Sequence, residues 1–169
     1  MKHLPVILLL ALLATACRDV PVIDVAAPKT DSLEENNMNA NRYISQGEES
    51  QINAYVERRG WQMRRLNGGT RVMETKGGDA VGRKIDYEDT VVINYDIEAI
   101  SGAEVYSNLT DTVVAGRLQP TRGLDVALRT LSRGSEAVVI VPSEQAYGVV
   151  GDGDRISTRM ILIYRLKVN

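Results

Sequence analysis

Residues 116–148, GRLQPTRGLDVALRTLSRGSEAVVIVPSEQAYG, determine how the rest of the chain is arranged. Four apolar side chains in this stretch recur at i, i+3, i+4 and i+7, which places them on one face of a helix: Leu124, Ala127, Leu128 and Leu131. Asp125 lies in the first turn, where a negative charge suits the positive end of the helix dipole. Gly134 follows as a residue suited to ending a helix. The pattern predicts one short helix over residues 123–133.

The same stretch continues with a strand and a loop. Residues 137–141, AVVIV, are uninterrupted apolar residues, typical of a buried strand, and Pro142 closes them. Tyr147 then stands between Ala146 and Gly148, so a loop presents one aromatic side chain between two small neighbours.

This segment resembles the second half of the FKBP-type peptidyl-prolyl isomerase domain. The matching positions lie in register without a gap: Gly116, Gly123, Gly134, Ala137, Pro142 and residues 146–148. A second unit of strand, turn and strand resembles an earlier part of the same domain at Tyr95, Gly102, Val105, Tyr106 and Ser107. The resemblance implies an α+β fold, in which a twisted antiparallel sheet wraps around one short helix.

Other apolar segments predict the remaining elements. Asn67-Gly68 is a hairpin signal between two short strands, the second over residues 70–75. Further strands are expected at residues 90–100 and 103–108. A last strand is expected at residues 160–168, where the apolar run 160–164 fits the centre of a sheet with both faces covered. A loop rich in glycine and charge occupies residues 76–88, and we assign residues 77–169 to the FKBP-like domain.

Residues 42–76 hold an accessory helix and the hairpin. The helix is predicted over residues 48–59, with Ile52, Tyr55 and Val56 as its apolar stripe and Gly60 after its end. A narrow stripe favours packing on the domain as a satellite. The alternative is that the helix joins two copies in a homodimer, as accessory N-terminal helices do in some bacterial relatives.

The first residues have the layout of a secretory signal. A short basic start precedes an apolar run at residues 6–13, which is too short to span a bilayer, and Ala14-Thr15-Ala16 precede Cys17. Small residues followed at once by cysteine resemble the lipobox of bacterial lipoproteins, although Leu13 stands one place earlier than usual. We therefore expect a signal peptide at residues 1–16, lipidation of Cys17 and a membrane anchor. An ordinary signal peptide with an incidental cysteine is the alternative.

Residues 17–41 are polar and aperiodic, which predicts a flexible tether between lipid and domain. The expected location is the bacterial envelope, facing the periplasm, with the outer membrane favoured. Lys and Arg residues are dispersed and the net charge is only −2, so no nucleic-acid groove is expected. Asp152-Gly-Asp154 lacks the later ligands of a calcium loop and is interpreted as a solvated turn. We expect neither a metal nor a cofactor.

Prolyl isomerisation needs no nucleophile, because only rotation about the imide bond, with a barrier of about 20 kcal/mol, has to be accelerated. An apolar pocket and a few hydrogen bonds that favour the twisted imide are sufficient. The resemblance implies a pocket with Leu124 as floor, substrate-binding positions at Val105, Tyr106 and Leu162, and walls that include Tyr95 and Tyr147. It also implies two hydrogen-bond donors, the Tyr147 hydroxyl and the Thr121 N–H.

This sequence departs from the family pattern at the pocket. The family usually has tryptophan at the position of Leu124, phenylalanines at Val105 and Leu162, and aspartate at Tyr106. Two functions therefore stay open. The first is a prolyl isomerase acting on proline-containing exported or envelope polypeptides. The second is a catalytically weak or inactive peptide-binding or chaperone module in an envelope complex.

Overall fold

The computed structural model describes residues 30–78 and 83–169. Its contacts divide the chain into two compact units, residues 1–37 and 38–169. Helix α2, Thr30–Arg58, begins in the first unit, and its part from Met38 onward belongs to the second. The fold described below is that of the second unit.

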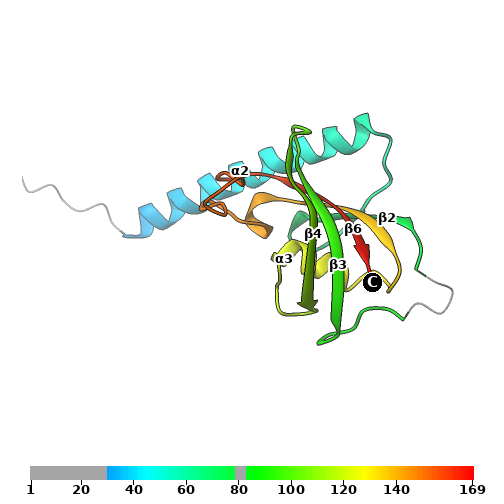
Figure 1. The fold of residues 1–169 in the computed structure, drawn as a ribbon. Coiled ribbons are helices and arrows are strands. Elements are labelled where there is room, and N and C mark those ends of the chain that lie inside the picture. Colours follow the sequence, from blue (N-terminus) through cyan, green and yellow to red (C-terminus); the bar gives the residue numbers. More distant parts are fainter. Residues whose placement is uncertain (1–29, 79–82) are drawn as a thin grey trace, which may run out of the picture. The chain divides into compact units, whose positions relative to one another are not determined.

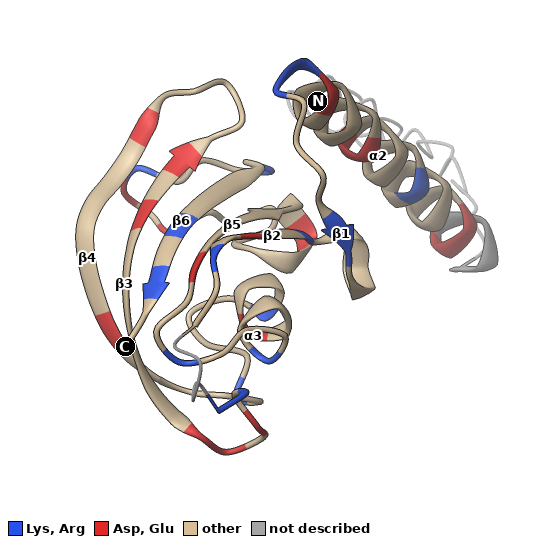
Figure 2. Cartoon of the chain, turned by 90° about the vertical axis from the view of Figure 1, so that its right-hand side faces the viewer, with Lys and Arg blue, Asp and Glu red and all other residues tan. Residues whose placement is uncertain are grey.

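A six-stranded antiparallel sheet forms this unit, with its strands in the order β1-β2-β5-β6-β3-β4. Strands β2, β3, β4 and β6 are labelled in Figure 1. The strands are β1 Arg64–Arg65, β2 Arg71–Lys76, β3 Thr90–Ala99, β4 Glu104–Val114, β5 Glu136–Val141 and β6 Leu162–Val168. The sheet curves around the short helix α3, Arg122–Leu128 (Figure 2). This confirms the predicted α+β class and the wrapped sheet.

Alternating side chains of the strands build the core on the face toward α3. Strand β3 shows the pattern most clearly, because every second residue from Val91 to Ala99 is buried. Leu124, Ala127 and Leu128 of α3 are fully buried against this face. Strand β6 lies between β5 and β3, so the strand expected at residues 160–168 occupies the centre of the sheet, as predicted.

The opposite face of the sheet is covered by α2. Ile52 and Tyr55 are buried there in a second apolar cluster, together with the outward-facing residues of two central strands and a neighbouring loop: Val138, Ile140, Ile161 and Ile163. The accessory helix therefore packs on its own domain. The homodimer hypothesis stays a prediction.

Several predicted boundaries were wrong. Helix α2 begins at Thr30 rather than at residue 48, so residues 30–41 of the predicted tether are helical. Side chains from residue 34 to 42 are exposed, so burial does not hold this part of the helix. Glu34, Glu35, Met38 and Ala40 are strong helix formers, and the sequence interpretation gave too little weight to that propensity.

The other corrections concern α3 and β4. Helix α3 ends at Leu128 instead of residue 133, and Gly134 donates its N–H to the Val168 carbonyl (2.9 Å) at the end of the sheet. Strand β4 continues to Val114 because it stays paired with β3 over its length. The hairpin at Asn67-Gly68 is confirmed, with the 3-10 turn η2, Asn67–Gly69, between β1 and β2.

The predicted signal peptide, Cys17 and residues 17–29 lie outside the described residues. Within residues 30–78 and 83–169, no helix has the length and apolar character needed to cross a bilayer.

Candidate functional site

The floor of the candidate pocket is built where α3 meets the curved sheet. Thr121 caps α3, and its hydroxyl accepts the N–H of Leu124 (3.3 Å), as expected of threonine at this position. Threonine here fixes the first turn, so Leu124 is directed into the core. The Thr121 N–H donates to none of the other described residues.

Four predicted site residues belong to the buried core of the domain, although they come from four different elements: Tyr95 on β3, Val105 on β4, Leu124 on α3 and Leu162 on β6. Leu124 and Leu162 are 0% exposed, Val105 is 6% exposed and Tyr95 is 7% exposed. These side chains thus form a closed floor with almost no exposed surface.

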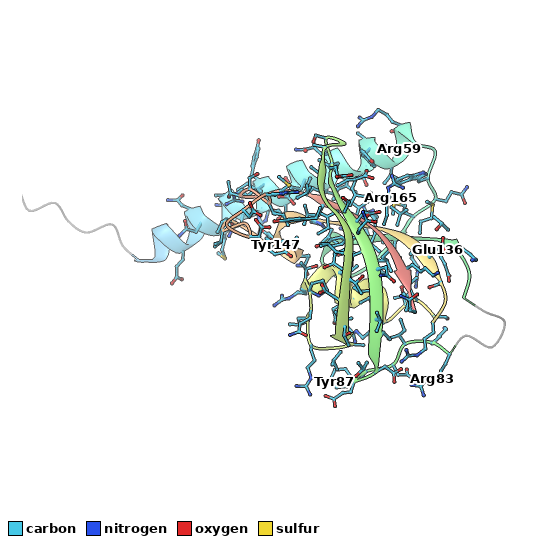
Figure 3. All side chains as sticks on the ribbon, viewed as in Figure 1. Arg59, Arg83, Tyr87, Glu136, Tyr147 and Arg165 are labelled. Atoms are coloured by element: carbon cyan, nitrogen blue, oxygen red, sulfur yellow. The ribbon has the colours of Figure 1, made fainter. Side chains whose placement is uncertain are left out.

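The rim above this floor includes Tyr147 and Tyr106, both partly buried against the same cluster. Tyr147 lies in the loop that follows β5 and the turn η3, Ser143–Gln145 (Figure 3). Its hydroxyl makes no hydrogen bond to another of the described residues. Burial raises the pKa of Tyr147, and the charges of Asp152 and Asp111 raise it further. The hydroxyl is therefore a protonated donor at neutral pH.

Tyr95 differs, because its hydroxyl already has a partner. It donates to the carboxylate of Asp111 on β4, a residue that the sequence interpretation missed. Burial, followed by this hydrogen bond, raises the pKa of Tyr95. The signal for Asp111 was weak, because an acidic residue in a strand with one solvated face is ordinary. Because the Tyr95 hydroxyl is already bonded to Asp111, the ring is the part of this side chain that remains to contact a ligand.

Tyr106 is likewise bound to the protein. Its hydroxyl donates to Asp152 (2.6 Å) and reaches Asp154 (3.2 Å), and the hydrogen bond to Asp152 raises the pKa of Tyr106 to about 12. The guanidinium of Arg155 lies 5.3 Å from the centre of its ring. The Asp152 carboxylate also accepts the N–H groups of Asp154 (2.9 Å) and Ile156 (2.8 Å), which confirms the predicted turn.

Tyr164 is a second residue that the sequence interpretation missed. It lies two positions after Leu162 on β6, so it faces the same side of the sheet, and its ring centre is 5.9 Å from that of Tyr95. The side chain is fully buried. Its hydroxyl lies close enough to Thr121 for that residue to affect its pKa, but the two groups do not reach hydrogen-bond geometry. The alternation of side chains along the strand, counted from Leu162, is the sequence signal that could have identified Tyr164.

Comparison with known proteins shows which family this chain belongs to. The sequence model described as "FKBP-type peptidyl-prolyl cis-trans isomerase" matches residues 82–169, a little over half of the chain. The chain belongs to this family. The isomerase is also similar in fold to the 1.6 Å crystal structure of a peptidyl-prolyl cis-trans isomerase from Pseudomonas syringae pv. tomato str. DC3000. That match has a TM-score of 0.61 and 22% identity, and it covers 75% of this chain and 92% of the other. A search of curated proteins gave no match.

Membership explains the chemistry of the site. The enzyme is a peptidyl-prolyl cis-trans isomerase that acts on proline-containing polypeptides. Its reaction breaks no σ bond, so an apolar floor, aromatic rims and one or two donors suit it better than a nucleophile with a base. The candidate site between α3 and the sheet consists of such apolar and aromatic residues.

Proposed function

We propose that this isomerase twists the Xaa-Pro bond of envelope polypeptides between the Tyr147 hydroxyl and the apolar surface over Leu124. The observation that carries the proposal is that Tyr95, Val105, Leu124 and Leu162 all belong to the apolar core against which Tyr147 packs. The unpartnered hydroxyl of Tyr147 supports its role as a donor to a peptide carbonyl. The Thr121 N–H is proposed as the second donor.

The catalytic effect comes from differential binding. Twisting the imide removes amide resonance, so the ring nitrogen becomes pyramidal and the carbonyl turns away from the plane of the ring. Donors placed for the turned carbonyl stabilise this state more than either planar isomer. A barrier lowered by about 5–7 kcal/mol corresponds to a rate increase of about 10^4–10^5.

A direct assay tests the activity. A peptide containing Ala-Leu-Pro is converted from cis to trans in the presence of the full chain, and the trans isomer is detected by an isomer-specific protease or by NMR exchange. Catalysis above the uncatalysed rate, lost on denaturation of the protein, is the expected result. A rate at the uncatalysed background would contradict the proposal.

The second candidate is a peptide-binding module with little catalysis. The departures from the family pattern at Leu124 and Tyr106 motivate it, because the flat aromatic floor that would orient the proline ring for catalysis is absent. Peptide binding by calorimetry, combined with background isomerisation, would identify this second function. Both measurements use the same peptide, so the two candidates are separated in one experiment.

The location of the substrate is proposed from the N-terminal sequence. The basic start, the apolar run and the small residues before Cys17 support a cleaved signal and a lipid anchor. The isomerase then acts on exported or envelope polypeptides. Expression of the full sequence in a bacterium, followed by membrane fractionation and mass spectrometry, tests this. Acylated protein in the membrane fraction, lost in Cys17→Ser, is expected; unprocessed cytosolic protein would contradict it.

A further inference from the structure

A buried carboxylate of α2 contacts the segment that carries Tyr147. Glu48 is 7% exposed and lies in a part of the chain outside residues 82–169. Its carboxylate accepts the backbone N–H of Ser143 (2.8 Å) and also the Ser143 hydroxyl, across 95 residues of sequence. Ser143 is the first residue of η3 and is itself buried. One acidic side chain thus satisfies both donors of Ser143.

Ser143 in turn holds the two residues on either side of Tyr147. Its carbonyl accepts the N–H of Ala146 (3.0 Å) and the N–H of Gly148 (2.8 Å). The backbone at both ends of Tyr147 is therefore tied to the residue that Glu48 fixes. A change in the position of Ser143 moves both attachment points of the tyrosine together.

The helix that carries Glu48 is itself firmly docked. Ile52 is fully buried against the outer face of the sheet. One residue after Glu48, Glu49 pairs with Arg71 of β2, and Asn53 also accepts from Arg71 (2.9 Å). Desolvation acts to raise the pKa of Glu49, but the hydrogen bonds and charges of Arg71 and Arg65 outweigh it and lower the pKa. Glu48 is thus presented to Ser143 from a fixed support.

A buried carboxylate with neutral donors is costly unless its hydrogen bonds are well placed. Two donors from one residue meet that requirement at Glu48. Packing of α2 alone does not need this charge, because the apolar cluster around Ile52 supplies the contact with the sheet. We infer that Glu48 is a positioning residue, which sets the η3 turn and thereby the place of the Tyr147 hydroxyl over the pocket.

This inference rests on the proposed donor role of Tyr147. Its test includes hydrogen exchange, which does not depend on that role. The variants are Glu48→Ala, which removes both hydrogen bonds, and Glu48→Gln, whose amide oxygen can still accept one of them. Glu49→Ala is the matched control, because it removes the ion pair with Arg71 from the same turn of α2 without touching Ser143. All are made in the full chain and assayed well below their melting temperatures.

The first readout is hydrogen exchange of the backbone amides of residues 144–149. Glu48→Ala is expected to speed exchange at Gly148 roughly tenfold or more, because hydrogen bonds to a charged group are lost from its anchor. Glu48→Gln is expected to give an intermediate value. Glu49→Ala is expected to leave the exchange rates of these amides unchanged, even if it lowers the free energy of unfolding as much as Glu48→Ala does. Equal exchange in Glu48→Ala and Glu49→Ala would overturn the inference.

The second readout is isomerisation of the peptide. A displaced donor lowers the stability of the twisted state, so kcat/KM should fall roughly fivefold or more in Glu48→Ala, mainly in kcat, with partial rescue in Glu48→Gln. A fall of the same size in Glu49→Ala would reveal a merely structural role and overturn the inference. If the wild-type chain has no activity, the proposed catalysis fails, whereas the exchange data still decide whether Glu48 holds the loop.

Discussion

Replacement of Tyr147 by phenylalanine isolates the contribution of one hydroxyl. The ring stays, so the packing of Tyr147 against the apolar cluster is kept. Because the hydroxyl makes no hydrogen bond to another described residue, its loss leaves no protein group unpaired. The free energy of unfolding is therefore expected to change by no more than about 0.5 kcal/mol.

The effect on catalysis follows from the same geometry. One neutral hydrogen bond contributes about 0.5–1.5 kcal/mol, which corresponds to a loss of roughly two- to thirteenfold in rate. If the bond is made mainly to the twisted imide, kcat falls and KM stays close to its wild-type value. The assay is protease-coupled isomerisation of an Ala-Leu-Pro peptide over a range of peptide concentrations. Urea titration of the same samples reports the free energy of unfolding.

Tyr43→Phe is the matched control, since Tyr43 on α2 is 82% exposed and belongs to no described cluster around the pocket. It should change neither kcat nor stability. An unchanged kcat/KM in Tyr147→Phe, with an active wild-type enzyme, would refute the donor role. A loss far beyond thirteenfold together with a large drop in stability would refute the claim that the hydroxyl is unpartnered.

Three further perturbations test the fold around the site. Ile52→Ala should lower the free energy of unfolding by about 2–5 kcal/mol in urea, whereas the exposed neighbour variant Gln51→Ala should change it by less than about 0.5 kcal/mol; equal effects would contradict the docking of α2. Leu124→Trp restores the residue usual in the family, but Leu124 is fully buried, so overpacking should lower stability by about 1–3 kcal/mol. An unchanged or higher melting temperature would reveal unfilled space beneath the site. Burial raises the pKa of Tyr95 and of Tyr164, so the stability they confer is complete below pH 10 and falls at higher pH, where the unfolded chain loses its phenolic protons first. The expected slope is up to about 1.4 kcal/mol per pH unit for each tyrosine; urea titrations between pH 9 and 11.5 should show a shallower fall in Tyr164→Phe, and a flat profile would contradict the effect of burial.

Local patterns were enough to predict most of the sheet and the helix inside it. Residues 137–141 and 160–164 are apolar in succession because both of their faces are covered, one by α3 and the other by α2. Asn67-Gly68 predicted its hairpin because Gly68 takes a positive φ of 69°, which glycine adopts without strain. Such features depend only on neighbouring residues or on burial. Both can be inferred from the pattern of residue types in a single sequence.

The missed contacts depend on how distant segments are brought together. Asp111 meets Tyr95 across 16 residues, and Glu48 meets Ser143 across 95. Neither pair has a spacing that marks it, since a polar residue on a strand or helix is normally solvated. Their partners are set by the bulged pairing of β3 with β4 and by the docking of α2 on the outer face. A pattern of one or two residue types cannot predict such pairings.

The aliphatic floor changes which groups can act on a substrate. With leucine in place of an aromatic floor, α3 and the sheet close over Leu124 and Leu162, and neither keeps exposed surface. Contact with a proline ring then falls to the rim, where Tyr106 already donates its hydroxyl to a carboxylate, as Tyr95 of the floor also does. Tyr147 is the rim tyrosine whose hydroxyl has no partner among the described residues, so it is the one able to donate to a peptide carbonyl. Under the proposed mechanism, catalysis therefore depends on how firmly the Tyr147 loop is held.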